Sequence, residues 1–475
     1  MSEDQTRRIA IVGGGIAGLA AAYELTRQQR EKGLDLSLDI FESRDRLGGV
    51  ILTEREGDYV LDAGPDAILT LKPAAVQLCR ELGLDDEIIP TRDEHRGVAL
   101  YSRGRLRSLP YGTGSSTLRK LEAYATSGVV SWGAKLRMAA DLVLPRGKPR
   151  EDESMSDFFG RRLGREAVER IVDPLIAGIY SGDPDRLSIC SLFPRFPQMV
   201  AKRRSILLSL LKAPQSSRTD GRTLPVFCSL REGLGQLVEA LIEHLDDTRI
   251  LLGTDIRAVR KGENGYAIAT DEGERDGYSD IILATPAWVA ARLLARDFGA
   301  VTEAIQSIRY VSSGAVFFSF KRDEVGDRLR GYGFLVPNCE GRRINGATWI
   351  SNKFEHRSPK DGFLVRCFVG GDRTAEQLEM DDDALVGMCL EELREIAGVT
   401  AKPLFSRVYR WRQSNPQYDV GHAARSQRID AELSRYPGLY VTGSGFRGIG
   451  LPDCVRDGRE TARSLLEATP RQQPD

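Results

Sequence analysis

The sequence has few of the residues that build metal sites and disulfide frameworks. Its 475 residues include seven cysteines and four histidines. The cysteines form no Cys-x-x-Cys pair, and no histidine stands near them at zinc-ligand spacing. We therefore expect buried thiols in a reducing compartment, with neither a metal site nor a redox dithiol.

The sequence also has almost no net charge and no long apolar runs. Lys and Arg number 67 against 68 Asp and Glu, which predicts no nucleic-acid partner. No stretch approaches the ~18 apolar residues of a membrane-spanning helix. Residues 1–8 are polar and carry no secretory signal pattern. The chain is long enough for two or three globular domains, and we expect a cytoplasmic protein that at most lies on the inner face of the cell membrane.

A glycine-rich turn near the start predicts a dinucleotide site. Residues 9–12 are an apolar strand pattern, residues 19–30 are helical in character, and a GxGxxG turn joins them. Such a turn brings backbone N–H groups and the positive end of a helix to a pyrophosphate. The predicted cofactor contacts here are Gly13, Gly14, Gly15, Ile16, Ala17 and Gly18.

Two further segments extend this site and favour FAD over NAD. A second strand pattern, 34–41, ends at Glu42, whose carboxylate is placed to bind ribose hydroxyls. After Glu42 come a basic residue suited to phosphate and two glycines that permit close approach of backbone. A later Gly-Pro turn again offers backbone to a ligand. The predicted contacts are Glu42, Ser43, Arg46, Gly48, Gly49, Gly64, Pro65, Asp66 and Ala67.

In this order, GxGxxG, ExxxRxGG and DxGP resemble the amine oxidase, phytoene desaturase and protoporphyrinogen oxidase superfamily of flavoproteins. The resemblance implies an extended FAD, with adenosine near Gly13 and Glu42 and the ring system near Gly64 to Asp66. It also implies that the backbone of Val259 meets adenine. The implied fold is α/β: a discontinuous Rossmann-like FAD-binding domain of the GR2 type, an α+β substrate domain and a helical membrane-associated insertion.

The domain ranges follow from where nucleotide-domain patterns stop and return. We assign 1–95, 225–300 and 432–475 to FAD binding, 96–110 and 301–431 to substrate binding, and 111–224 to the helical insertion. Residues 439–443 predict a strand that leads, through a glycine-rich loop, to a helix beginning near Pro452. This loop supplies the predicted flavin contacts Ile449, Gly450 and Leu451.

Several segments resemble protoporphyrinogen oxidases more than amine oxidases. They are the loop ending in Asp453-Cys454 and residues 105–110, 173–184 and 410–422. Within the last segment, Trp411 is interpreted as an aromatic platform against the cofactor, with core packing as the alternative. His422 is interpreted as a structural histidine.

The resemblance implies oxidation of protoporphyrinogen IX to protoporphyrin IX through three flavin cycles, with dioxygen as acceptor. No catalytic side chain is assigned, because the flavin itself accepts hydride. Coproporphyrinogen III is the alternative substrate. An amine oxidase, a carotenoid desaturase, or a binding module similar to Rab GDP dissociation inhibitors are further alternatives. Arg96 is the predicted substrate contact, although strict register with the family places Val98 there.

Residues 191–222 predict contact with an anionic membrane surface. Seven basic residues stand against the single acid Asp220, and the apolar run 206–211 interrupts them. The alternative is a helix packed on its own domain with a solvated basic face. The oligomeric state is left open between monomer and homodimer.

Overall fold

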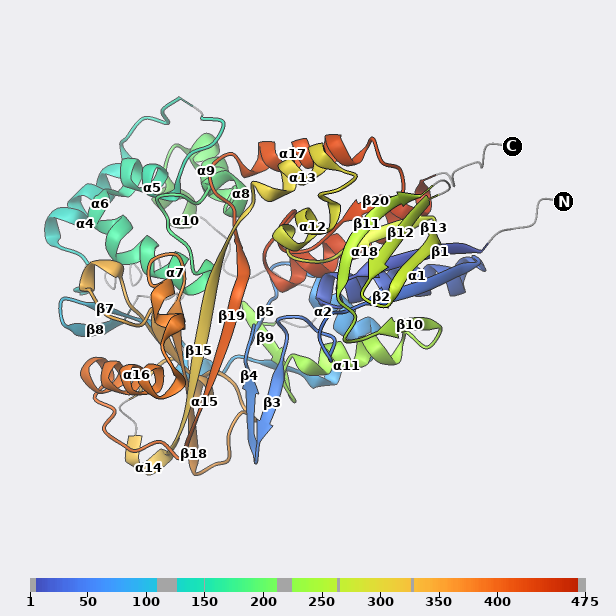
Figure 1. The fold of residues 1–475 in the computed structure, drawn as a ribbon. Helices are drawn as coiled ribbons and strands as arrows, with labels where there is room; N and C mark the ends of the chain where they lie inside the picture. Colours follow the sequence, from blue (N-terminus) through green and yellow to red (C-terminus); the bar gives the residue numbers. More distant parts are fainter. Residues whose placement is uncertain are drawn as a thin grey trace.

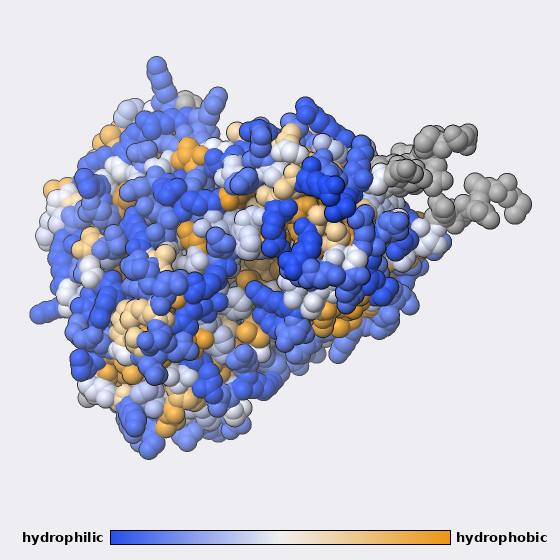
Figure 2. All heavy atoms as spheres, viewed as in Figure 1, coloured by the Kyte–Doolittle hydropathy of each residue, from blue (hydrophilic) through white to orange (hydrophobic). Residues whose placement is uncertain are grey.

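The computed structural model describes residues 6–108, 126–148, 150–211, 224–262, 265–325 and 329–468. They form two sheet-centred domains and a cap of helices beside them (Figure 1). Figure 2 shows mostly hydrophilic side chains on one face of the molecule, with small, separate apolar patches.

The first domain is built on a five-stranded parallel sheet in the order β10-β2-β1-β14-β20. Its strands come from segments far apart in the chain, so this domain is discontinuous. The strands are β10 (Thr248–Leu251), β2 (Leu36–Phe41), β1 (Arg7–Val12), β14 (Asp280–Leu283) and β20 (Leu439–Val441).

Alternate residues of β1 serve two cores. Ile9 and Ile11 pack with helices on one face, and Ala10 and Val12 pack with an antiparallel sheet and helices on the other. The first face is covered by α1 (Ile16–Lys32), α2 (Ala74–Glu81), α11 (Gly235–Glu243) and α18 (Leu451–Glu467). The second is covered by β11 (Ile256–Gly262), β12 (Gly265–Thr270), β13 (Gly273–Tyr278), α12 (Ala287–Leu294), α13 (Gly299–Gln306) and α17 (His422–Leu433).

The second domain is a seven-stranded mixed sheet in the order β19-β15-β18-β17-β16-β7-β8. Its strands are β19 (Phe405–Gln417), β15 (Arg309–Lys321), β18 (Gly362–Gly370), β17 (Gly346–Trp349), β16 (Gly333–Leu335), β7 (Ala99–Ser102) and β8 (Arg105–Ser108). Helix α16 (Asp382–Ala397) packs on one face, and the short helices α14 (Arg322–Val325) and α15 (Ile350–Lys353) lie at strand ends.

Short strands join the two domains. The hairpin β3 (Thr53–Glu56) and β4 (Tyr59–Asp62) leads out of the first domain toward β15 and β19 (Figure 1). A small sheet in the order β5-β9-β6 follows, formed by β5 (Ile68–Leu69), β9 (Phe227–Leu230) and β6 (Ile88–Pro90).

The cap consists of short helices with their own apolar core. They are α4 (Trp132–Ala139), α5 (Met155–Leu163), α6 (Arg165–Ala167), α7 (Asp173–Tyr180), α8 (Ile189–Leu192), α9 (Arg195–Arg203) and α10 (Ile206–Leu211). In the part of the chain that the structure describes, no helix is both long and apolar enough to cross a membrane.

The predicted membrane-associated character of the insertion is not supported. Val200 of α9 and Ile206 of α10 are buried in the core of the cap, where Phe193 and Phe196 pack against them. The apolar side of this segment therefore meets its own domain, as the alternative interpretation expected. The basic residues 212–222 lie outside the described residues.

The α/β flavoprotein fold expected from the sequence is confirmed. The strands of the parallel sheet fall within 1–95, 225–300 and 432–475. Those of the seven-stranded sheet fall within 96–110 and 301–431. The domain boundaries themselves stay a prediction.

Candidate active site

The glycine turn between β1 and α1 leaves room for a ligand. Gly13 has a φ of +109°, a conformation that favours glycine. A Cβ added to Gly15 would meet no atom nearer than 4.0 Å, whereas one added to Gly18 would lie 2.1 Å from the Gly13 oxygen. Gly15 therefore opens the space, and Gly18 permits the close packing of helix on strand.

The first turn of α1 presents backbone donors to this space. The helix begins at Ile16, and among the described residues no side chain caps its Gly15 end. The N–H groups of Ile16 and Ala17 thus belong to the unsatisfied first turn, which carries the positive end of the helix dipole. This arrangement fits a pyrophosphate.

Glu42 fixes the shape of the turn. Its Oε2 accepts a hydrogen bond from the Gly14 N–H at 2.8 Å, and its Oε1 accepts one from the Arg44 N–H at 3.0 Å. The side chain is buried beside the end of β2. A carboxylate has further lone pairs for a ribose hydroxyl, so the ribose contact of Glu42 stays a prediction, as does the cofactor contact of the neighbouring Ser43.

Arg46 holds a loop in place. Its guanidinium donates to the carbonyl oxygens of Leu47, Gly49 and Ile51 at 2.8 to 3.1 Å. The loop brings Gly48 beside the glycine turn, where the Gly48 N–H donates to the Gly14 oxygen at 2.8 Å. A phosphate contact of Arg46 stays a prediction, and its observed partners give it a structural role.

Side chains of the seven-stranded sheet hold the segment that contains the DxGP motif. The Ala63 oxygen accepts hydrogen bonds from Trp411 Nε1 at 2.9 Å and from Arg366 at 3.3 Å, and Arg366 also donates to the Asp62 oxygen at 3.2 Å. Residues 64–67 are only partly buried, so solvent or a ligand can reach them. Trp411 therefore fastens this segment to β19.

Three cations and two carboxylates form a charged clamp at the same segment. The clamp comprises Asp62, Asp66, Lys353, Arg357 and Arg366. Arg357 pairs with Asp62 at 3.2 Å, and Lys353 Nζ lies 2.7 Å from Asp66 Oδ2. Burial raises the pKa of Asp62, although the positive charge of Arg357 acts to lower it. Burial also acts to raise the pKa of Asp66, but Lys353 and Arg366 outweigh it, so this pKa is lowered.

The loop before α18 is the last segment of the candidate cofactor site. Helix α18 begins at Leu451 with Pro452 in its first turn, and no side chain among the described residues caps its Gly450 end. Ile449 and Gly450 are accessible, and Lys72 pairs with Asp453 at 2.5 Å. The positive end of the helix dipole at Gly450 and Leu451 stabilises negative charge placed beside it.

A hollow of about 460 Å³ lies where the Arg46 loop meets β19. The Arg44 guanidinium stacks on the Trp411 ring at 5.9 Å. The hollow is lined by Arg44, Arg46, Leu52, Val408, Tyr409, Arg410, Trp411, Arg412 and Ser414. Its arginines suit an anionic group.

The family model for flavin containing amine oxidoreductases matches residues 16–466. The chain belongs to this family. The enzyme is an FAD-dependent oxidoreductase, as its sequence indicated, and the glycine turn, the two uncapped helix ends and the accessible segment 64–67 fit that cofactor.

Named relatives cover nearly the whole chain. It is 32% identical to the coproporphyrinogen III oxidase of Bacillus subtilis (strain 168), over 98% of each chain. It is 28% identical to the chloroplastic protoporphyrinogen oxidase of Nicotiana tabacum, over 96% of this chain and 84% of that protein. A crystal structure from Exiguobacterium sp. 255-15, provisionally named a protoporphyrinogen oxidase, aligns with a TM-score of 0.87 and 29% identity over 98% of this chain and all of that one.

Two predicted residues of this flavoenzyme lie apart from the contacts described above. Val259 is fully buried in the middle of β11, while the backbone of Gly253 and Thr254 is hydrogen-bonded to that of Arg44 and Glu42. The segment before β11 therefore lies beside Glu42, where the adenosine is predicted, and the adenine contact of Val259 stays a prediction. Arg96 is 46% exposed and lies 4.0 Å from Asp93, so its substrate role also stays a prediction.

The basic residues of the clamp were not among the predicted site residues. Arg366 interrupts the apolar run of β18, GFLVRCFVG, yet it is only 7% exposed. A charged residue inside such a run needs buried partners, and this was the available signal. Lys353 ends α15 and Arg357 lies between α15 and β18, and neither position gives a comparable sign in the sequence.

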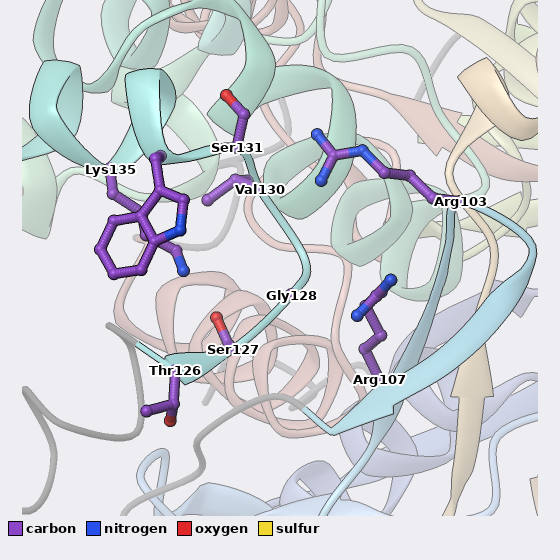
Figure 3. A pocket seen from close by; sticks show the side chains of 9 residues that line it. Arg103, Arg107, Thr126, Ser127, Gly128, Val130, Ser131 and Lys135 are labelled. Atoms are coloured by element: carbon purple, nitrogen blue, oxygen red, sulfur yellow. The ribbon is translucent and has the colours of Figure 1, made fainter.

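A second hollow, of about 410 Å³, lies at the edge formed by β8 and α4 (Figure 3). It contains none of the predicted site residues. It is lined by Arg103, Arg107, Thr126, Ser127, Gly128, Val130, Ser131, Trp132 and Lys135.

Proposed function

We propose that this enzyme oxidises a porphyrinogen to the corresponding porphyrin. The observation that carries the proposal is the match of nearly the full chain to relatives named for this activity, together with a site that fits FAD. Six hydrogens leave the macrocycle in three two-electron steps. Three molecules of dioxygen accept them and become three molecules of hydrogen peroxide.

The residues around the site agree with chemistry that needs no protein nucleophile. The bound flavin supplies the hydride acceptor. His422 is buried, stacks on Tyr418 with ring centroids 3.5 Å apart, and its Nε2 lies 3.1 Å from the Phe446 oxygen. Burial lowers its pKa to about 4, so the imidazole is neutral near pH 7. This supports the interpretation of His422 as a structural residue.

We propose coproporphyrinogen III as the preferred substrate and protoporphyrinogen IX as the second candidate. The compared relatives with 30% identity or more are named coproporphyrinogen III oxidases. The sequence had favoured protoporphyrinogen IX, so the order of the two candidate substrates is reversed. Lys72 pairs with Asp453, but its side chain is 48% exposed, and such an ammonium group suits a substrate rich in carboxylates. The chloroplastic relative favours the second candidate.

Turnover of the two purified porphyrinogens tests this proposal. Porphyrin fluorescence and oxygen consumption are followed at equal substrate concentrations, and hydrogen peroxide is measured in parallel. We expect about three peroxide molecules for each porphyrin and a higher kcat/KM for coproporphyrinogen III. A higher value for protoporphyrinogen IX would reverse the order, and no porphyrin formation from either would contradict the function.

The cellular setting is also a proposal. We propose a cytoplasmic enzyme, monomeric or homodimeric, that makes at most peripheral contact with an anionic membrane surface. The basic exposed residues Lys202 and Arg203 of α9 support the contact. Amine and carotenoid oxidation share the fold, but no relative that we compared at 30% identity or more is named for either.

A further inference from the structure

The charged clamp brings an excess of positive charge to the predicted position of the flavin ring. Lys353 and Asp66 have side chains that are 16% and 18% exposed, and Arg357 and Asp62 are 1% and 3% exposed. Three cations stand against two carboxylates, so the clamp carries at least one net positive charge. Because these groups are withdrawn from water, their field is screened less than that of surface charges.

The three cations differ in what they hold. Arg357 donates to the oxygens of Leu230 and Arg231, and Arg366 donates to the oxygens of Asp62 and Ala63. Both arginines therefore fix backbone. Lys353 donates to the side chain of Asp66 and lies 5.1 Å from the Phe354 ring. Its charge can thus be removed while the backbone hydrogen bonds of the segment remain.

We propose that Lys353 raises the reduction potential of the bound flavin. The proposal rests on the predicted position of the ring near Gly64 to Asp66 and on FAD as the cofactor. Reduction by two electrons with uptake of one proton leaves the flavin as an anion, whereas the oxidised ring is neutral. A fixed positive charge stabilises the anion more and so favours reduction. Asp66 opposes this effect, since its carboxylate carries the opposite charge.

The test is the midpoint potential of the flavin in the purified holoenzyme, measured by reductive titration against reference dyes. Lys353→Met should favour the oxidised state at least tenfold relative to wild type, which is a fall of about 30 mV for a two-electron couple. Lys353→Arg should keep the wild-type potential. Asp66→Asn should shift it in the opposite direction to Lys353→Met.

A matched pair outside the site controls for general effects of losing an ion pair. Arg165 and Glu169 form such a pair in the cap, with side chains that are 92% and 41% exposed. Arg165→Met and Glu169→Gln should leave the potential unchanged. The flavin spectrum and the thermal midpoint of each variant establish that it is folded and loaded.

Opposite shifts in the two site variants support the proposal, because structural damage would move both in one direction. An unchanged potential in Lys353→Met, or shifts of the same sign, would overturn it. If Asp66→Asn does not retain FAD, the comparison of Lys353→Met with Lys353→Arg decides. The titration uses no porphyrinogen, so failure of the proposed substrate leaves this result intact.

Discussion

Gly15 is the residue of the glycine turn with the most open surroundings, since an added Cβ has no neighbour nearer than 4.0 Å. We expect Gly15→Asp to abolish FAD binding, because its carboxylate would occupy the space of the pyrophosphate and repel it. The purified variant should be colourless. Gly387→Asp, at an open position in α16, is the control and should keep its flavin. Stoichiometric flavin in Gly15→Asp would refute the assigned turn.

Gly18 is constrained by the protein itself. Its added Cβ would lie 2.1 Å from the Gly13 oxygen, so Gly18→Val should distort the turn and lower stability together with FAD binding. From the sequence, Gly18 was predicted to contact the pyrophosphate, as Gly15 was. Its close neighbour here is backbone, and the physical cause is therefore steric.

Glu42 links the turn to the end of β2 through two charge-assisted hydrogen bonds. Each is worth about 1.5 to 3 kcal/mol, so Glu42→Ala should weaken FAD affinity roughly tenfold or more. Titration of the apoprotein with FAD measures the effect. Glu31→Ala, on the exposed end of α1, is the control. Equal affinities in wild type and Glu42→Ala would leave Glu42 without a role in the site.

At the scale of elements, Glu24 joins helices α1 and α18. Its carboxylate is fully buried and accepts hydrogen bonds from Arg459 and Arg463 at 2.8 Å and from Arg27 at 2.6 Å. Burial alone would raise its pKa, but the three guanidinium groups lower it to about 2. A depressed pKa adds stability above the unfolded value near 4.5, and this contribution is lost as the pH falls toward 2.

Glu24→Gln should therefore lower the free energy of unfolding by roughly 3 kcal/mol at pH 7. The difference between variant and wild type should shrink as the pH is lowered from about 5 to 3. Urea unfolding across this range measures it. A difference that is constant with pH would mean that packing, and not the charge, is the cause.

Helix α9 leaves basic residues exposed while its apolar side is buried. We expect salt-sensitive binding to anionic vesicles, since each basic residue near such a surface contributes ~1 kcal/mol. The double change Lys202→Glu and Arg203→Glu should reduce co-sedimentation. Arg204 is left unchanged because its guanidinium donates to the Leu142 oxygen and its own oxygen accepts a hydrogen bond from Arg162. No binding by wild type at low salt would exclude the surface contact.

The elements that could be predicted are those with local signals. The strand, turn and helix at 9–30 follow from GxGxxG, and the start of α18 follows from Pro452. The apolar residues from Ile206 onward did not distinguish the two interpretations, because burial in the cap, as found for Ile206, and burial in lipid demand the same residues. Which of the two applies depends on partners distant in the sequence.

For the molecule as a whole, the predicted cofactor site draws on both domains, so FAD should stabilise the entire fold. FAD at 100 times its Kd should add about 2.7 kcal/mol to the free energy of unfolding. Thermal unfolding of apoprotein and holoenzyme measures the gain. Loss of FAD should expose both domains to proteolysis. Identical midpoints with and without FAD would contradict a shared site.

The strand order of the seven-stranded sheet could not be predicted from the sequence. Strand β7 pairs with β16, more than 200 residues away, and no local pattern encodes such a partner. The same holds for the clamp, which unites Asp62 with Arg357 and Arg366. The discontinuous first domain was predictable, because each of its segments carries its own strand or glycine pattern.

The strand order β10-β2-β1-β14-β20 has a consequence for biosynthesis. Strand β1 and the glycine turn are made first, but the sheet is complete only when residues 439–441 have joined β14. Helix α18, which packs on α1, comes later still. A chain that is still being synthesised thus contains the glycine turn but lacks β20 and α18. We therefore expect stable FAD binding only after α18 has been made and has packed on α1, and a truncation before α18 should weaken FAD retention.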